Sequence, residues 1–404
     1  MDVFDFEEFH TRLVPGLLAD GRGVAAGRYL GDGQTLALRL TAGPAYTYRS
    51  TGDDLDITAG EDAATVVELA PDAFADLVSE AWSVFGLLYA DRVTTPKGSF
   101  ADFARWEAPL QALWFGRPIY GADTVAALVD GDDNPLDLLR SFSLRDVEGA
   151  KDAAGFLSAT GFVVFEQVFD APEIDALNAV VAEARAKAAP GDGRSWWATR
   201  SNGQEVCCRL TYMAKRSPAV ARLAEDDRLA AIAALASDEL LPCLDRLDGV
   251  SVVIKNPDVV TGLSDLPWHR DCGMGGHRIL CPGLNVGVQL DHADAANGQL
   301  LYLAGSHHHA AQQLAASDLD GLPVVAVETE PGDVTVHFGH TLHAAPPPTS
   351  ATAGRKALYV GYHVPEAFNA IGPGQSYNDV LVARDAGRVK SVDEVVAGGA
   401  TPAG

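Results

Sequence analysis

Basic residues are scarce in this chain: lysine and arginine number 30 against 55 aspartates and glutamates in 404 residues, a formal net charge of −25. A surface this acidic repels a phosphate backbone and anionic lipid headgroups, which argues against nucleic acid or a membrane as the main partner. No apolar run reaches the roughly 18 residues that a membrane-spanning helix needs. The acidic start, MDVFDFEEFH, differs from a secretory signal. We therefore expect a cytoplasmic protein that acts on a small molecule.

Cysteine is sparse as well. The five cysteines are Cys207, Cys208, Cys243, Cys272 and Cys281, and their spacing matches neither a zinc pattern nor a dense disulfide framework. Hydrophobic residues make up 47% of the chain, enough for a large core, which excludes wholesale disorder. At about 150 residues per domain, the length favours two or three domains. These features favour a folded enzyme.

The first third of the chain mixes strand and helix patterns, and it ends at the polar segment DGDDNP, residues 130–135, which we take as a linker. We therefore predict a smaller α+β amino-terminal domain over residues 1–135. Its predicted elements are strands over 34–39, 45–49 and 64–69 and helices over 71–89 and 99–115.

The rest of the chain becomes rich in strands after a first predicted helix, strand and helix. Short strands separated by Gly, Pro and Asp loops, with no long helices between them, favour an antiparallel barrel or sandwich. The predicted elements are helices over 143–159 and 171–188, and strands over 161–169, 250–255, 284–291, 299–304, 323–329, 332–338 and 355–364.

Histidines are crowded into this strand-rich part, where ten of the eleven lie between His269 and His363. His269 and Asp271 form an H-x-D pair, and two such residues on an extended segment point to the same face. A third histidine from a later strand would give two imidazoles and one carboxylate, the ligand set of non-haem Fe(II) oxygenases. The candidates in the stretch GDVTVHFGHTLHAAPP are His337, His340 and His343.

The carboxy-terminal block, roughly residues 143–365, resembles the phytanoyl-CoA dioxygenase family of Fe(II)- and 2-oxoglutarate-dependent oxygenases. The resemblance rests on the entry segment GFVVFEQVFDAPEIDAL, on VVIKNPDVVTGLSDLPWHRD, on NGQLLYLAGSHH, and on GDVTVHFGHTLHAAPPPTSATAGRK, which occur in the family's order. It implies a double-stranded β-helix (jelly-roll, cupin-like) oxygenase core with flanking helices over residues 136–404. It also implies iron, 2-oxoglutarate and dioxygen as the reacting partners.

The same resemblance assigns roles to single residues. His343 falls on the family's distal histidine, so the implied metal ligands are His269, Asp271 and His343, with His340 as the rival for the last position. Arg355 matches the arginine that binds the distal carboxylate of 2-oxoglutarate, for which a guanidinium fork is suited. Lys255 stands where the family places a strand lysine near the cosubstrate. The family often has a hydroxyl residue two positions after the distal histidine, but this chain has Ala345, so we expect Thr341 or a water to replace that contact.

A weaker resemblance covers residues 35–120, which look like the sterol-carrier-protein fold. The shared features are a strand, a helix that opens with Pro-Asp-x-Phe, and a second helix that reaches Gly-Arg-Pro. Such a domain could offer an apolar tunnel to the substrate, pack on the oxygenase domain, or mediate dimerisation.

The combined expectation is a dioxygenase that hydroxylates an unactivated C–H bond of a small or apolar natural-product-like substrate. Desaturation, epoxidation and epimerisation remain open because they begin with the same hydrogen abstraction. Asp271 argues against the related halogenases, which replace this carboxylate with a small residue. The alternatives from other classes are a zinc-dependent hydrolase with the same three ligands and a non-catalytic carrier of lipids or small molecules.

Overall fold

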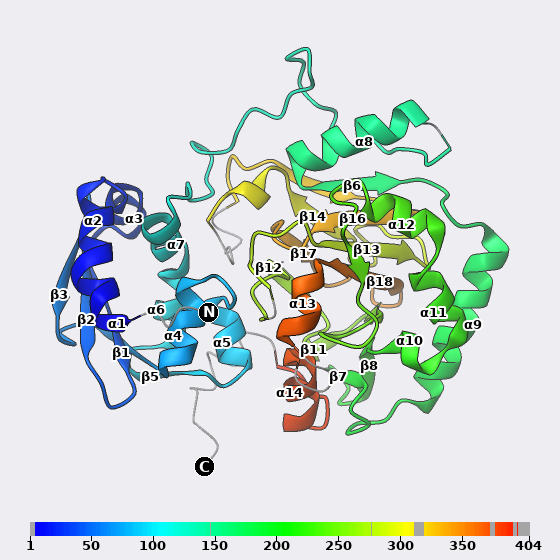
Figure 1. Cartoon of the computed structure of the whole chain (residues 1–404). Helices are drawn as coiled ribbons and strands as arrows, with labels where there is room; N and C mark the ends of the chain where they lie inside the picture. Colours follow the sequence, from blue (N-terminus) through cyan, green and yellow to red (C-terminus); the bar gives the residue numbers. More distant parts are fainter. Residues whose placement is uncertain are drawn as a thin grey trace.

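The computed structural model describes residues 5–145, 147–275, 277–310, 319–371, 376–390 and 394. Two modules follow each other along the chain, and each has its own sheet and its own apolar core. The amino-terminal module, blue to cyan in Figure 1, lies beside a larger module coloured green to red. Across the described residues, no helix has both the length and the apolar character needed to cross a membrane.

The amino-terminal module is built on a five-stranded mixed sheet in the order β3-β2-β1-β4-β5. Strand β1 pairs antiparallel with β2 and parallel with β4. Its core is rich in buried aromatic rings, including Phe74, Phe103 and Trp114. The strands are β1 (Asp32–Leu40), β2 (Ala45–Thr51), β3 (Leu55–Ala59), β4 (Thr65–Leu69) and β5 (Val93–Lys97), and the helices are α1 (Phe6–Glu8), α2 (Val14–Ala19), α3 (Gly23–Leu30), α4 (Pro71–Val78), α5 (Val84–Tyr89), α6 (Phe100–Arg105) and α7 (Glu107–Phe115).

Each of the two helices predicted here is broken in two, and Pro109, which we expect to bend or split the second one, lies inside α7. The predicted helix 99–115 breaks at Trp106, between α6 and α7, and the predicted helix 71–89 breaks between α4 and α5. At the second break, the side chain of Ser83 caps α5, while its backbone N–H and its hydroxyl donate to the carbonyl oxygen of Gly273, at 2.7 and 3.0 Å. Gly273 belongs to the other module, so a long-range contact accompanies the break.

The larger module consists of two antiparallel sheets. One follows the path β11-β7-β8-β10-β18-β13-β16-β6, with β9 added beside β18, and the other has the order β12-β17-β14-β15. The predicted α+β class with a core of antiparallel strands and flanking helices is confirmed. The strands are β6 (Phe162–Phe165), β7 (Ser195–Arg200), β8 (Glu205–Leu210), β9 (Leu241–Pro242), β10 (Ser251–Lys255), β11 (Val259–Thr261), β12 (Leu266–His269), β13 (Leu284–Gln289), β14 (Leu300–Leu303), β15 (Val324–Val327), β16 (Val334–Phe338), β17 (His343–Ala345) and β18 (Arg355–His363).

Helices flank these sheets at the outer edge of the molecule, as Figure 1 shows for α9, α11 and α12. The helix α14 lies next to α5 of the amino-terminal module. The helices of this module are α8 (Val147–Thr160), α9 (Ala171–Lys187), α10 (Met213–Arg216), α11 (Pro218–Ala224), α12 (Asp227–Ala233), α13 (Pro365–Ala370) and α14 (Tyr377–Arg384).

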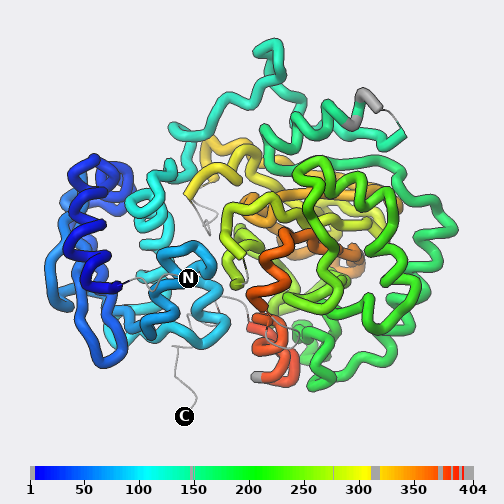
Figure 2. Tube along the Cα trace, viewed as in Figure 1, coloured from blue at the N-terminus to red at the C-terminus, as the bar shows by residue number. Residues whose placement is uncertain are grey.

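The segment between the modules runs over the top of the view in Figure 2 and is tied to the larger module along its way. The hydroxyl of Tyr120 donates to the carbonyl of Ala304 at 2.9 Å, and its backbone N–H donates to Ala310 at 3.1 Å. The predicted linker forms a local turn, in which the N–H of Asp130 donates to Asn134 at 2.8 Å. A division into domains at residue 135 stays a prediction.

Candidate active site

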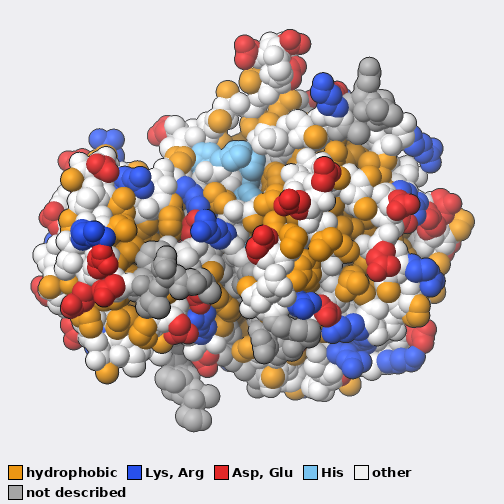
Figure 3. Space-filling model, in the orientation of Figure 1, with side chains coloured by type: hydrophobic (Ala, Val, Ile, Leu, Met, Phe, Trp, Pro, Cys, Tyr) orange, Lys and Arg blue, Asp and Glu red, His pale blue; other side chains and the backbone are white. Residues whose placement is uncertain are grey.

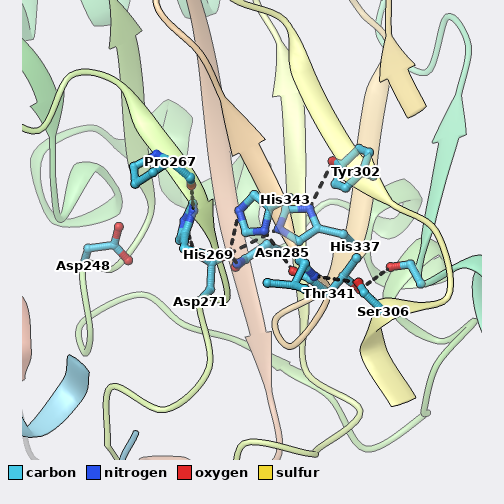
Figure 4. A network of polar contacts seen from close by, with 12 residues as sticks. Asp248, Pro267, His269, Asp271, Asn285, Tyr302, Ser306, His337, Thr341 and His343 are labelled. Atoms are coloured by element: carbon cyan, nitrogen blue, oxygen red, sulfur yellow. Dashed lines mark hydrogen bonds and ion pairs between the residues drawn. The ribbon is translucent and has the colours of Figure 1, made fainter. Parts of the chain in front are cut away.

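Two short strands bring the histidines of the predicted metal site together. His269 is the last residue of β12 and His343 the first of β17, and the antiparallel register pairs these two residues directly. Their ring centroids lie 4.3 Å apart. Asp271 follows β12 by two residues, so its carboxylate reaches the same place from the loop (Figure 4). Residues far apart in the sequence thus meet at one end of the smaller sheet.

The ligand atoms of His269, Asp271 and His343 all lie within 4.8 Å of one another. Nε2 of His269 is 3.4 Å from Oδ1 of Asp271, and Nε2 of His343 is 3.4 Å from Oδ2. The two imidazoles therefore flank the two oxygens of one carboxylate. This spacing leaves one point that all three side chains can reach, as a facial arrangement of two imidazoles and a carboxylate requires.

Backbone carbonyls fix which nitrogen of each ring is free. Nδ1 of His269 lies 2.7 Å from the carbonyl oxygen of Pro267, and Nδ1 of His343 lies 3.0 Å from that of Thr341. Because a carbonyl can only accept, each Nδ1 must carry the proton and donate it, which leaves the Nε2 lone pair unprotonated and aimed at Asp271. Such outer hydrogen bonds are what orient metal-binding imidazoles. The residues present therefore fit a divalent iron ion.

The charge states agree with this reading. Burial lowers the pKa of His343 to about 3 despite the neighbouring carboxylate, so its ring is neutral at neutral pH. Burial by itself would raise the pKa of the Asp271 carboxyl, but the neighbouring rings of His343, His269 and His337 hold it well below its usual range. A neutral imidazole beside an ionised carboxylate is the form that binds a cation.

The two rival histidines occupy different places. His337 lies on β16 and contacts the Asp271 carboxylate. Its Nε2 is 3.2 Å from Oδ2 of Asp271, and its Nδ1 is 3.2 Å from the hydroxyl of Tyr302. His340 packs against the rings of Phe338 and His307 and is absent from the converging group. The geometry therefore favours His343 as the distal ligand and gives His337 a hydrogen-bonding role.

Asn285 is a site residue that the sequence analysis missed. It lies on β13, and its Nδ2 donates to Oδ2 of Asp271 at 2.5 Å (Figure 4). The backbone N–H of Asp271 donates to Gly339 at 2.8 Å. With His337, these contacts fix both the carboxylate and the backbone of Asp271. The only signal in the sequence was a polar residue within the apolar strand LNVGVQ.

Arg355 is placed to receive an anion. It begins β18, is 2% exposed, and donates through Nε to the carbonyl of Gly298 at 2.8 Å. Its Nη1 is buried without a hydrogen-bond partner among the described residues. Tyr359, four residues further along the same strand, hydrogen bonds with the guanidinium, and both side chains line the same cavity as the three candidate ligands. A buried donor with no partner is costly unless a ligand supplies one.

Lys255 is arranged differently from its neighbour in the register, Arg355. Its ammonium donates to Asp265 at 2.5 Å, to the carbonyl of Ala345 at 2.7 Å and to that of Ser264 at 3.2 Å. An ammonium has three donors, so these contacts use all of them, and burial lowers its pKa to about 8. The lysine therefore braces the strand end around Arg355, and it has no donor left for direct contact with a cosubstrate.

Thr341, one of the two substitutes expected for the hydroxyl that Ala345 lacks, also makes its hydrogen bond elsewhere. The Thr341 hydroxyl donates to the carbonyl of Gly161 at 2.8 Å, and the side chain is fully buried. Of the two substitutes expected for that contact, this leaves a water. His292 and Asp294 also stand in H-x-D spacing, but they lie in an exposed loop beside Glu330 and are absent from the converging group.

The cavity above the three ligands is closed partly by the amino-terminal module. Phe85 and Tyr89 of α5 line it together with His269 and Asp271. Other apolar walls come from Trp196, Leu263, Tyr377 and Leu381. Figure 3 shows histidine atoms reaching the surface where the two modules meet. The larger module alone would therefore lack part of this wall.

Comparisons with known proteins found one matching family model and several similar solved structures. Residues 157–357 match the family model of phytanoyl-CoA dioxygenase (PhyH). Among solved structures, EvdMO1 is 25% identical over 53% of this chain and 50% of its own (TM-score 0.44). AviO1 from Streptomyces viridochromogenes Tue57 is 23% identical over 55% and 96% (TM-score 0.45), and the iron-bound EctD from S. alaskensis is 22% identical over 56% and 81% (TM-score 0.45). The match thus spans half the length of EvdMO1. No curated protein matches the chain.

Residues 157–357 have the family signature of an iron- and 2-oxoglutarate-dependent oxygenase. Over these residues the chain belongs to the phytanoyl-CoA dioxygenase family, and its cofactor and cosubstrate are iron and 2-oxoglutarate. The matched range begins after the amino-terminal module, so the sterol-carrier-like character of residues 35–120 stays a prediction.

Proposed function

We propose that this protein hydroxylates a small, largely apolar substrate, with His269, Asp271 and His343 as the iron ligands. The observation that carries the proposal is the convergence of two unprotonated Nε2 atoms and one ionised carboxylate on a single point of the cavity. Bound there, iron together with 2-oxoglutarate and dioxygen supplies the removal of a hydrogen atom from carbon and its replacement by a hydroxyl group.

The protein's own residues orient the reacting groups. Asn285 and His337 hold Oδ2 of Asp271, so the carboxylate keeps one orientation while Oδ1 faces His269. Arg355 offers its unpartnered Nη1, beside the Tyr359 hydroxyl, to the distal carboxylate of 2-oxoglutarate. Lys255 acts through position alone, as the brace between β10 and the end of β17.

The cavity walls support a mainly apolar substrate. The rings of Phe85, Tyr89 and Trp196 face the space over the ligands and can bury an apolar skeleton while water is kept out. A polar anchor is also present: Arg209 lies 3.4 Å from Asp248, and its Nε is buried without a partner among the described residues. We infer that a carbonyl or hydroxyl oxygen of the substrate accepts from Arg209.

The test is turnover with a panel of apolar, oxygen-bearing small molecules. Succinate is measured with and without each compound, and the product is weighed by mass spectrometry. The proposal expects a compound that stimulates succinate formation and gains one oxygen atom. A product that has lost two hydrogen atoms would indicate desaturation instead of hydroxylation. A product of unchanged mass with inverted stereochemistry would indicate epimerisation. Turnover that continues without dioxygen would favour the hydrolase alternative and refute the proposal.

A further inference from the structure

A second group of metal-binding side chains lies beside the candidate iron site, in the loop between β12 and β13. Cys272, His277 and Cys281 each offer one ligand atom, and these atoms lie within 4.8 Å of one another. The Sγ atom of Cys281 is 3.4 Å from Nδ1 of His277. A sulfur and a nitrogen that share a tetrahedral zinc ion are about 3.6 Å apart, given Zn–S and Zn–N bonds of about 2.3 and 2.0–2.1 Å. Cys281 and His277 are therefore already spaced like two ligands of one zinc ion, and Cys272 lies within reach of the same ion.

A fourth candidate ligand stands next to them. The ring centroid of His363, the last residue of β18, lies 5.0 Å from that of His277. Its Nδ1 is buried and has no hydrogen-bond partner among the described residues. A Cβ added at Gly283 would lie 3.0 Å from Sγ of Cys281 and 3.4 Å from Nδ1 of His363, so thiol and imidazole border the same small space. A buried nitrogen without a partner points to a missing ligand.

We propose that Cys272, His277 and Cys281 bind a Zn²⁺ ion distinct from the iron, with His363 facing the fourth position. Two thiolates and one or two imidazoles form a soft donor set that suits zinc. Binding replaces the two thiol protons, which pass to solvent. Nδ1 of His277 also lies 2.9 Å from the carbonyl of Arg278, so on binding its proton leaves Nδ1 and the neutral ring carries a proton on Nε2 instead.

The position of this loop indicates what the zinc would do. Cys272 follows Asp271 directly, and its backbone N–H donates to the same Gly339 carbonyl at 2.8 Å. A Cβ at Gly275 would lie 2.3 Å from the ring of Trp82, so the loop is packed tightly against the amino-terminal module. A zinc ion would therefore fix the segment that both follows an iron ligand and carries the contact between the modules. The spacing Cys-x4-His-x3-Cys differs from common zinc patterns, which is why sequence analysis found none.

The test uses Co²⁺ as a spectroscopic probe on the full-length, reduced protein. Thiolate-to-cobalt charge transfer and the strong visible bands of tetrahedral cobalt report binding to this cluster, because the candidate iron site contains no sulfur. We expect about one equivalent to produce these bands in the unaltered protein and in His343→Ala. The bands should be lost in Cys281→Ser and in His277→Gln, and kept in Cys207→Ser, the matched control for a buried cysteine outside the cluster.

The supporting measurement is metal content after expression with added zinc, which should fall from about one zinc per chain to about none in Cys281→Ser while iron binding is kept. His277→Gln keeps both thiols and covers the case in which Cys281→Ser fails to fold. Absence of the cobalt bands from the unaltered protein, or their persistence in both cluster variants, would overturn the proposal. A Cys272–Cys281 disulfide in the protein purified under reducing conditions would overturn it too.

Discussion

Gly86→Ala tests whether helix α5 is seated on the loop that carries Asp271. A Cβ at this position would lie 2.1 Å from the carbonyl oxygen of Gly273 and 3.1 Å from the ring of Trp82. The oxygen is a backbone atom, so the helix and the loop must separate by about 1 Å to restore an ordinary contact. The two hydrogen bonds from Ser83 end on this same carbonyl and would be stretched by that movement.

The expected free-energy change follows from these contacts. Loss of two hydrogen bonds costs about 1–3 kcal/mol, while replacing a helical glycine by alanine would otherwise stabilise the protein by about 0.5–1 kcal/mol. We therefore expect Gly86→Ala to lower the free energy of unfolding by about 1 kcal/mol, the difference between the middle values of these two effects. Gly16→Ala in α2 is the matched control, because nothing lies within 4 Å of its added Cβ, and it should stabilise or leave the free energy unchanged.

The assay is urea denaturation followed by tryptophan fluorescence, to which Trp82 at the contact contributes. Gly86→Ala should lower the midpoint, and Gly16→Ala should raise it or leave it unchanged. If Gly86→Ala behaves like Gly16→Ala, α5 does not rest on the Gly273 carbonyl, and the cavity wall formed by Phe85 and Tyr89 loses its support.

Three further predictions concern the cosubstrate, the module boundary and pH. Arg355→Leu should raise the 2-oxoglutarate concentration for half-maximal succinate formation by at least about 30-fold, since losing a charge-assisted pair costs about 2–5 kcal/mol, and Arg355→Lys should recover part of this loss. Near-normal saturation in Arg355→Leu would show that Arg355 does not bind 2-oxoglutarate. A protein cut near residue 135 should still bind Fe(II) and 2-oxoglutarate but lose substrate selectivity with Phe85 and Tyr89, and an insoluble or metal-free fragment would contradict this. Burial lowers the pKa of His10 to about 4, against a hydrogen bond to Phe6 that raises it. As the pH falls, the unfolded chain binds this proton before the folded chain does, so the free energy of unfolding should fall by about 3 kcal/mol between about pH 6.5 and pH 4. His10→Phe should make the denaturation midpoint depend less on pH, and an unchanged pH profile would contradict the prediction.

Much of the larger module was readable from the sequence because its strands are bounded by turn residues and its H-x-D pair is local. The distal histidine was harder: His337, His340 and His343 lie within seven residues, and only the pairing of β17 with β12 separates them. Spacing along one strand carries no information about a partner strand that is far away in the chain. The resemblance to a family supplied what the spacing could not.

Other features were beyond the sequence because they depend on contacts between distant segments. The break between α4 and α5 accompanies a contact with Gly273, which no periodicity reveals. The contact of Asn285 with Asp271 depends on the fold of the loop after β12. Lys255 was predicted to lie near the cosubstrate because a lysine occupies the same strand position in the family. Its ammonium donates instead to Ser264, Asp265 and Ala345, which come from two segments that are distant in the sequence. Short strands such as β12 and β17 were missed since three or four residues carry too little pattern.

The most direct test of the central claim is anaerobic titration with Fe(II) in the presence of 2-oxoglutarate, followed through the visible absorption band of the chelated metal. The unaltered protein and His340→Ala should both develop the band with about one equivalent of iron, since His340 lies outside the converging group. His343→Ala should fail to develop it, because one of the two unprotonated Nε2 atoms is gone. Loss of the band in His340→Ala together with its retention in His343→Ala would move the ligand and contradict the site described here.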